Sequence, residues 1–130
     1  MSTKKKLLQA AAGAAGGEAL NVEDVFSTYL YEGNGSTGQS IVNGIDLDNE
    51  GGLVWFKNRQ SGSYTSIFDT ERGVQKYLVS YNTDAEATVS TSLTAFNSNG
   101  FTIGGSSYVN RSDVNENQYA SWTFRKAPKF

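Results

Sequence analysis

The chain of 130 residues contains no cysteine and no histidine, and it has a single proline, Pro128. Without cysteine it can form neither a disulfide nor a thiolate metal site, and it has no cysteine nucleophile. Without histidine it lacks the commonest general base and the commonest metal ligand, so a Ser-His-Asp triad is impossible. These absences exclude several classes of enzyme and metalloprotein.

Charge is unevenly distributed along the chain. Eleven lysine and arginine residues stand against 13 aspartate and glutamate residues, which gives a formal net charge of -2. Three of the eleven are Lys4, Lys5 and Lys6, so the rest of the chain carries 8 basic and 13 acidic residues, a net charge of -5. An acidic body argues against a nucleic-acid partner, because nucleic acids are bound by basic patches. No apolar run approaches the length of a membrane span, so no membrane insertion is expected.

The abundant residue types indicate an all-β fold. Fourteen glycines, seven tyrosines and seven phenylalanines suit many short strands joined by glycine turns. Apolar runs bounded by turn formers predict strands over residues 25–32, 39–43, 53–57, 64–69, 75–81, 87–96, 101–103 and 119–125. Short strands at this spacing predict an antiparallel β-sandwich or jelly roll. Residues 53–56 are all apolar, which predicts a strand covered on both faces.

A different kind of segment precedes the predicted sandwich. Residues 2–15 are mostly good helix formers and are followed by two glycines, so the sequence predicts a short N-terminal helix. Leucine and alanine side chains gather near one face, but a helix of about a dozen residues is marginal alone in water. Two interpretations stay open: a helix that orders only against a partner, and a disordered tail. The chain therefore divides into residues 1–21, helix and linker, and residues 22–130, the sandwich domain.

Two neighbouring carboxylates raise the question of catalysis. Asp69 and Glu71 would share one face of a strand, which is compatible with the paired carboxylates of a glycosidase. The adjacent Arg72 favours charged carboxylates, whereas a general acid must hold its proton. We therefore interpret Asp69 and Arg72 as a structural corner, in which Asp69 accepts backbone hydrogen bonds and Arg72 ties two strands together. No catalytic residue is predicted.

An acidic loop imitates the start of an EF-hand. Asp46, Asp48 and Glu50 alternate before Gly51, but the twelfth position, which needs a bidentate glutamate, is Lys57. The EF-hand is therefore rejected and a solvated acidic turn is expected, with calcium in an irregular loop as the alternative. No metal site and no cofactor are predicted.

The aromatic residues are interpreted from their surroundings. Trp55 lies in the most apolar run, and Trp122 alternates in phase with other apolar residues, so both are expected in the core. Tyr64 and Tyr108 lie in segments rich in serine and glycine. They are the candidates for a contact surface, and for glycan contact if this chain binds sugars.

Four stretches of the chain resemble a family of bacteriophage structural proteins. They are YLYEGNGSTGQSIVNGIDLDNEGGLVWFKNRQ, FDTERG, SLTAFNSNGFTIG and YASWTFRKAPKF, and their order agrees with that family from about residue 24 to the end. The family is found in tail fibres and related virion appendages of marine and other phages, with a domain similar to concanavalin-like lectin sandwiches. Its members commonly continue past the last stretch into further β domains. The chain thus resembles the N-terminal portion of a longer fibre.

The resemblance implies a virion location, with synthesis in the cytoplasm of the bacterial host, and it brings no catalytic residues. Fibres of this kind attach through their N-termini, usually as trimers, to a tail or adaptor protein. The N-terminal segment would then form the attachment or oligomer interface, through Lys4, Lys5, Lys6, Leu7, Leu8, Ala11 and Ala15.

Three functions follow from these observations. The first is a non-enzymatic structural virion protein that combines an N-terminal attachment region with a β-sandwich. The alternative is a carbohydrate-binding, lectin-like module that recognises a host-surface glycan. The third is a glycan depolymerase, for which the sequence offers no credible acid–base pair.

Overall fold

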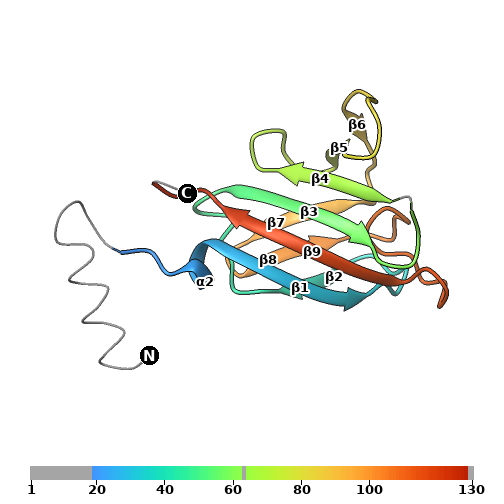
Figure 1. Cartoon of the computed structure of the whole chain (residues 1–130), viewed down its shortest axis with the longest axis horizontal. Coiled ribbons are helices and arrows are strands. Elements are labelled where there is room, and N and C mark those ends of the chain that lie inside the picture. Colours follow the sequence, from blue (N-terminus) through green and yellow to red (C-terminus); the bar gives the residue numbers. More distant parts are fainter. Residues whose placement is uncertain (1–18, 63, 129–130) are drawn as a thin grey trace.

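The computed structural model describes residues 19–62 and 64–128, and these residues form a sandwich of two β-sheets (Figure 1). One sheet has six strands in the order β1-β9-β3-β4-β5-β6, and the other has three in the order β2-β8-β7. Neighbouring strands pair antiparallel throughout the described part of the chain. The predicted all-β antiparallel sandwich is therefore confirmed.

The predicted strands correspond closely to those of the structure. The described strands are β1 (Phe26–Glu32), β2 (Gln39–Val42), β3 (Gly52–Asn58), β4 (Thr65–Asp69), β5 (Lys76–Val79), β6 (Ala87–Thr88), β7 (Leu93–Asn97), β8 (Gly100–Ile103) and β9 (Gln118–Arg125). The segment predicted as one strand over 87–96 contains two, β6 and β7. Between them the Ser92 hydroxyl donates to the carbonyl oxygen of Val89 at 2.6 Å, so the backbone turns there.

A single-turn helix, α2 (Val22–Val25), stands directly before β1 and packs against β1 and β9. Its last residue, Val25, is buried, and the strand predicted to begin there begins one residue later. The helix predicted over residues 2–15 lies outside the described residues. So do all seven residues of the predicted attachment interface, from Lys4 to Ala15.

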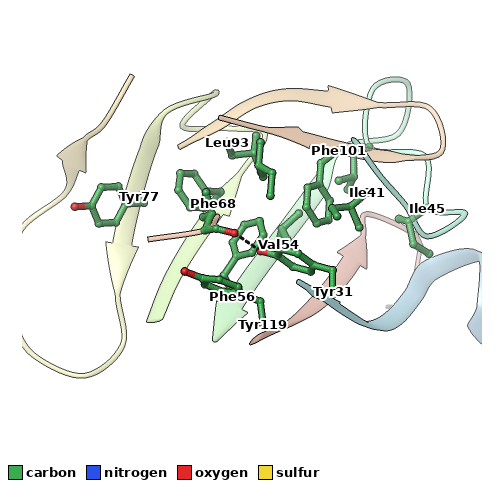
Figure 2. Packing of buried hydrophobic residues seen from close by; sticks show 13 residues of the cluster. Tyr31, Ile41, Ile45, Val54, Phe56, Phe68, Tyr77, Leu93, Phe101 and Tyr119 are labelled. Atoms are coloured by element: carbon green, nitrogen blue, oxygen red, sulfur yellow. Dashed lines mark hydrogen bonds between the residues drawn. The ribbon is translucent and has the colours of Figure 1, made fainter. Parts of the chain in front are cut away.

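The core lies between the two sheets, and Phe56 of β3 is at its centre (Figure 2). Its ring meets Phe68 of β4 edge-to-face, with centroids 5.6 Å apart, and Phe101 of β8 at 5.2 Å. The second contact joins the six-stranded sheet to the three-stranded one. Tyr31 of β1 stacks on Tyr119 of β9 at 5.3 Å and 11°. Aromatic contacts thus join neighbouring strands of the larger sheet and, through Phe56 and Phe101, the two sheets.

The last strand, β9, lies inside the larger sheet, between the edge strand β1 and β3. β9 pairs with β1 along one side and with β3 along the other. In this register Phe26 of β1 lies opposite Phe124 of β9, and Trp55 of β3 lies opposite Trp122 of β9. Because successive side chains of a strand point to opposite faces, the register decides which residues share a face of the sheet.

A buried asparagine positions the loop between β8 and β9. The side chain of Asn110 is fully buried, and its amide nitrogen donates to the carbonyl oxygens of Ser36 and Gly104, each at 2.9 Å. Its amide oxygen accepts the backbone N–H of Asn34 at 2.8 Å. These bonds satisfy backbone groups that would otherwise be buried without partners. They clamp the glycine-rich turn of residues 33–38 to the loop that carries Tyr108.

Candidate functional site

Tyr64 and Tyr108, the two tyrosines predicted as a contact surface, lie together in the structure. Tyr64 stands just before β4 and Tyr108 lies in the loop between β8 and β9, yet their ring centroids are 5.8 Å apart in an edge-to-face arrangement. Tyr108 also packs on Tyr77 of β5, with centroids 5.0 Å apart. Both residues are half-buried. Each ring therefore closes the edge of the core while part of it reaches solvent.

Arg111 completes a cluster with these tyrosines. Its Nη1 donates to the hydroxyl of Tyr64 at 2.9 Å, and its guanidinium carbon lies 5.5 Å from the centroid of that ring. Its Nη2 forms an ion pair with Glu116 at 2.9 Å, and its backbone N–H donates to the hydroxyl of Tyr119 at 3.1 Å. We call Tyr64, Tyr108 and Arg111 the tyrosine–arginine cluster. It offers an aromatic ring, a phenol and a fixed cation to a polar ligand.

The phenols behind the cluster are neutral at physiological pH. Burial raises the pKa of Tyr119, against the lowering effect of the hydrogen bond from Arg111. Burial is also the main cause that raises the pKa of Tyr77, and its hydrogen bond with Tyr108 acts in the same direction. Both groups therefore serve as rings and neutral hydrogen-bond partners, and they do not transfer protons near neutral pH.

Asp69 and Arg72 meet at the end of β4. The Nε of Arg72 lies 2.8 Å from Oδ2 of Asp69, and the backbone N–H of Arg72 donates to Oδ1 of the same carboxylate at 2.8 Å. The Nη1 of Arg72 reaches Oε2 of Glu86, just before β6, at 2.8 Å. The hydrogen bond with Glu86 is the largest cause that raises the pKa of Arg72. Arg72 thus connects the end of β4 to the segment that leads into β6.

Glu71 does not face Asp69 across a cleft. Its side chain is largely exposed and forms a close ion pair with Lys126, which follows β9. Asp69 and Glu71 are therefore engaged by two different cations, Arg72 and Lys126. This arrangement lacks the pair of opposed carboxylates, with a sugar-sized gap between them, that glycoside hydrolysis requires.

The acidic loop before β3 is a local turn. One carboxylate oxygen of Asp46 accepts the backbone N–H of Asn49 at 3.0 Å and the side-chain amide of Asn49 at 3.1 Å. These hydrogen bonds, the backbone one first, lower the pKa of Asp46. Within the described residues no three acidic side chains gather in a way that could hold a metal ion.

A groove lies on the outer face of the six-stranded sheet, the face turned away from the core and toward the viewer in Figure 1. Trp55 and Trp122 stand side by side in it, with ring centroids 5.6 Å apart at 61°. The groove has a volume of about 610 Å³, and Lys57, Tyr81 and Phe124 also line it. We call it the tryptophan groove. Its volume lies in the range of small-ligand sites, roughly 300–1,000 Å³.

The prediction that both tryptophans are core residues is wrong. Trp55 is 37% exposed, Trp122 is half-buried, and both point away from the second sheet. The expectation that β3 is covered on both faces is wrong for the same reason, since the described residues leave its outer face open at Trp55. Apolar character alone did not distinguish the face that meets a second sheet from the face that does not.

One feature of the sequence indicated that Trp55 lies on a solvent-facing side of β3, and another feature obscured it. Trp55 alternates in phase with Lys57, whose ammonium donates to the carbonyl oxygen of Ser61 at 2.8 Å. A lysine on that phase indicates a face that reaches solvent. However, the opposite phase ends in Asn58, which is fully buried and bonds the carbonyl oxygen of Glu116. Polar residues therefore lie on both phases of β3, so alternation of polar and apolar residues did not identify which face of this strand is the inner one.

Comparison with known proteins adds a family and no activity. A family model described as "Domain of unknown function (DUF7483)" matches residues 21–129, which include all nine described strands. The chain belongs to this family. No curated protein and no solved structure matches it. In the described residues no helix has the length and apolar character needed to cross a membrane.

Proposed function

We propose that this domain is a non-enzymatic structural module of a bacteriophage tail fibre or a similar virion appendage. The observation that carries the proposal is the position of the four stretches that resemble such proteins. They supply the framework: the clamped turn before β2, the adjacent strands β3 and β9 inside the larger sheet, the β7–β8 hairpin and the corner after β4. The four stretches that resemble phage fibre proteins therefore belong to the structural framework of the domain.

The structural corner at Asp69 and Arg72, together with the neighbouring Glu71–Lys126 ion pair, supports a role in bearing mechanical load. Arg72 joins β4 to the segment before β6, and Lys126 joins the end of β9 to the turn after β4. Three segments far apart in sequence are thus held at one corner by ion pairs. Each exposed pair contributes little alone, but a network restrains the chain at a place where the strands end. Such a corner suits a rigid unit within an assembly.

The distribution of charge supports attachment through the N-terminus. Lys4, Lys5 and Lys6 precede a body with a net charge of -5, and Leu7 and Leu8 follow them directly. A segment with a basic start and an apolar, small-residue stretch suits docking to a tail or adaptor protein, or to two further copies in a trimer. The virion is then the site of action, and the host cytoplasm the site of synthesis.

The proposal is tested in phage particles. Electron microscopy of intact particles should place this domain in a tail appendage, with the symmetry of a trimer. Removal of residues 2–17 should abolish incorporation while the sandwich still folds, because the core residues lie between Val25 and Ala120. Substitution of Asn21 by serine, outside the removed segment, serves as the matched control. Normal incorporation of the shortened chain would refute attachment through the N-terminus.

A second candidate function is glycan binding at the tyrosine–arginine cluster. The observation that favours it is the convergence of Tyr64 and Tyr108 from distant loops beside the fixed cation of Arg111. Rings and a guanidinium group are suited to sugar C–H faces and hydroxyls. A glycan array with the full chain should give a signal that is lost in Tyr64→Ala and kept in Tyr29→Ala, on the edge strand. Equal signals in both variants would remove this candidate.

A further inference from the structure

The tryptophan groove runs along β3 from an apolar end to a polar end. Register places Trp55 beside Trp122 of β9, and it places Lys57, two residues further along β3, beside Thr65 of β4. Phe124, two residues beyond Trp122 on β9, lies at the opposite end. All five residues line the groove. Because side chains two positions apart on a strand share a face, aromatic rings form one part of the groove, and a cation and a hydroxyl form the other.

The polar end of the groove has unused hydrogen-bonding groups. Thr65 is only 6% exposed, yet its hydroxyl has no hydrogen-bond partner among the described residues. The hydroxyl of Ser80, which also lines the groove, likewise has none there. The ammonium of Lys57 uses one of its three protons on the carbonyl oxygen of Ser61, at 2.8 Å. Since buried polar groups are normally hydrogen-bonded, these donors indicate a polar ligand at this end.

The charge of the groove favours an acidic ligand. Of the described residues that line it, only Lys57 is charged, so no aspartate or glutamate opposes an anion there. Lys57 forms no ion pair with any described residue. The chain outside Lys4, Lys5 and Lys6 nevertheless carries a net charge of -5. A cation without an acidic neighbour, on a body that is otherwise acidic, is complementary to a carboxylate of the ligand.

The aromatic part of the groove is open to solvent. Tyr81, which also lines it, is 50% exposed, and the rings of Trp55 and Trp122 are inclined at 61° to each other. An acyl chain is apolar along its whole length and would need an enclosed cavity to leave water. A sugar ring has an apolar C–H face and a polar edge of hydroxyls. It therefore fits an open aromatic surface with hydrogen-bond donors at one end.

The groove is too small to form a protein interface by itself. It spans β9, β3 and β4, and three strands about 4.8 Å apart over about five residues of about 3.3 Å each give a footprint of roughly 240 Å². A stable interface between folded proteins buries about 800 Å² on each partner. A short oligosaccharide therefore fits the groove better than a second copy of the chain does.

We propose that the tryptophan groove binds an acidic oligosaccharide built from uronic acids. A sugar ring lies on Trp55 and Trp122, its hydroxyls bond Thr65, and its carboxylate pairs with Lys57. None of the residues of the tyrosine–arginine cluster lines the groove, so the two sites are separate. The proposal does not rest on a virion role, and either can fail without the other.

Tryptophan fluorescence tests the proposal directly, because Trp55 and Trp122 are the chain's only tryptophans. The probes are oligosaccharides of galacturonic, mannuronic and glucuronic acid, each compared with the neutral oligosaccharide of galactose, mannose or glucose. At least one acidic probe should change the emission of the full chain in a saturable way and protect it from quenching by acrylamide. Its neutral counterpart should bind about tenfold more weakly, with a smaller difference at high salt.

Two variants separate the charge from the hydroxyl, with titration calorimetry as the measurement. Lys57→Gln should reduce the affinity for the acidic probe to that for the neutral one, because the change removes the charge and keeps a polar side chain. Thr65→Val should weaken both. Lys76→Gln, at an exposed lysine of β5 that does not line the groove, is the matched control and should bind as the parent does. The thermal midpoint of each variant verifies that the sandwich is folded.

Four outcomes would overturn the proposal. The first is no response to any of the three acidic probes, and the second is equal affinity for acidic and neutral probes. The third is binding that is lost in Tyr64→Ala and kept in Lys57→Gln, which would place the sugar at the tyrosine–arginine cluster. The fourth is emission of the ligand-free chain that shifts on dilution, which would mean that a second copy covers the groove.

Discussion

The two faces of the six-stranded sheet differ less in their residues than in what covers them. On the inner face, Val54 and Phe56 of β3 are completely buried, and so are the polar Ser121 and Thr123 of β9. On the outer face, Trp55 and Trp122 of the same two strands are partly exposed. The inner face is thus the more polar of the two along β9. Burial here is decided by the position of the three-stranded sheet and not by hydrophobicity alone.

The polar residues of the inner face are tolerated because most of them find partners. The hydroxyl of Thr123 accepts a hydrogen bond from the side-chain amide of Asn43 at 2.9 Å, and the Ser121 hydroxyl lies 3.4 Å from the carbonyl oxygen of Tyr29. Ser66 of β4 is an exception, since its hydroxyl has no protein partner. A buried polar atom costs little when it is bonded and about 1–3 kcal/mol when it is not. The comparison of the two faces therefore shows that a residue of this sheet is buried when the second sheet covers it, and that a buried polar residue is tolerated when it has a hydrogen-bond partner.

The largest expected effect is at the centre of the inner face. Phe56→Ala should lower the free energy of unfolding by about 3–5 kcal/mol, because it removes a ring that contacts both sheets and leaves a cavity. Urea denaturation followed by circular dichroism measures the loss. Phe56→Leu, which keeps most of the volume, should cost less than about 1.5 kcal/mol. Similar costs for the two variants would mean that the centre of the core lies elsewhere.

The neighbouring outward position should respond less strongly. Trp55→Ala should lower the free energy of unfolding by about 2 kcal/mol, since the ring is only partly buried. Urea denaturation followed by circular dichroism measures the loss, and Trp55→Phe, which keeps an aromatic ring in the groove, should cost less. Equal costs for Trp55→Ala and Phe56→Ala would mean that the outer face of β3 is as buried as its inner face.

Tyr31 tests the inner face through pH. Its hydroxyl donates to the carbonyl oxygen of Val109 at 2.6 Å, and burial raises its pKa well above the ordinary value of 10.0. Tyr31→Phe should cost about 1 kcal/mol at neutral pH, because it leaves that carbonyl unpaired. The unfolded chain releases the proton above pH 10.0 while the folded chain holds it, so stability falls as pH rises beyond that value.

The variant should therefore lose less stability than the parent between neutral and alkaline pH. Unfolding in urea at pH 7 and at pH 11 measures the difference. Tyr29→Phe, on the same strand but partly exposed, should leave the alkaline loss unchanged. Parallel losses for the parent and Tyr31→Phe would show that other groups cause the alkaline destabilisation.

The smallest expected effect is at the structural corner of Asp69 and Arg72. Arg72→Ala removes contacts to Asp69 and Glu86 that are open to solvent, so the thermal midpoint should fall only slightly, and less at high salt. Arg72→Lys should recover part of this loss at low salt. Scanning calorimetry at two salt concentrations measures both variants. A large, salt-independent loss would mean that the corner is a buried part of the core.

Much of the fold could be predicted because short-range rules decide it. Glycine turns and period-2 alternation located the described strands other than β6 and β7 with ends within a few residues. The split between β6 and β7 was missed because a serine hydroxyl, bonded to the backbone three residues earlier, interrupts an otherwise strand-like run. The approach of Asp69 and Arg72 was also accessible, because the two residues are three positions apart.

The candidate sites were only partly accessible. Tyr64 and Tyr108 were selected individually, but their contact joins loops 44 positions apart in the chain, and Arg111 was not selected at all. The tryptophan groove was missed because it depends on the register of β9 against β3, which sets Trp55 beside Trp122. Pairings of that sequence separation follow from the whole topology.

The amino-acid sequence alone determined the fold class, the strand positions and the absence of thiol and imidazole chemistry. These properties depend on residue types and on alternation within a few neighbours. Only the tertiary structure decided which apolar face is the core, which aromatic residues meet and where a groove opens. The physical reason is that β3 carries apolar residues on both faces, and the second sheet can cover only one of them.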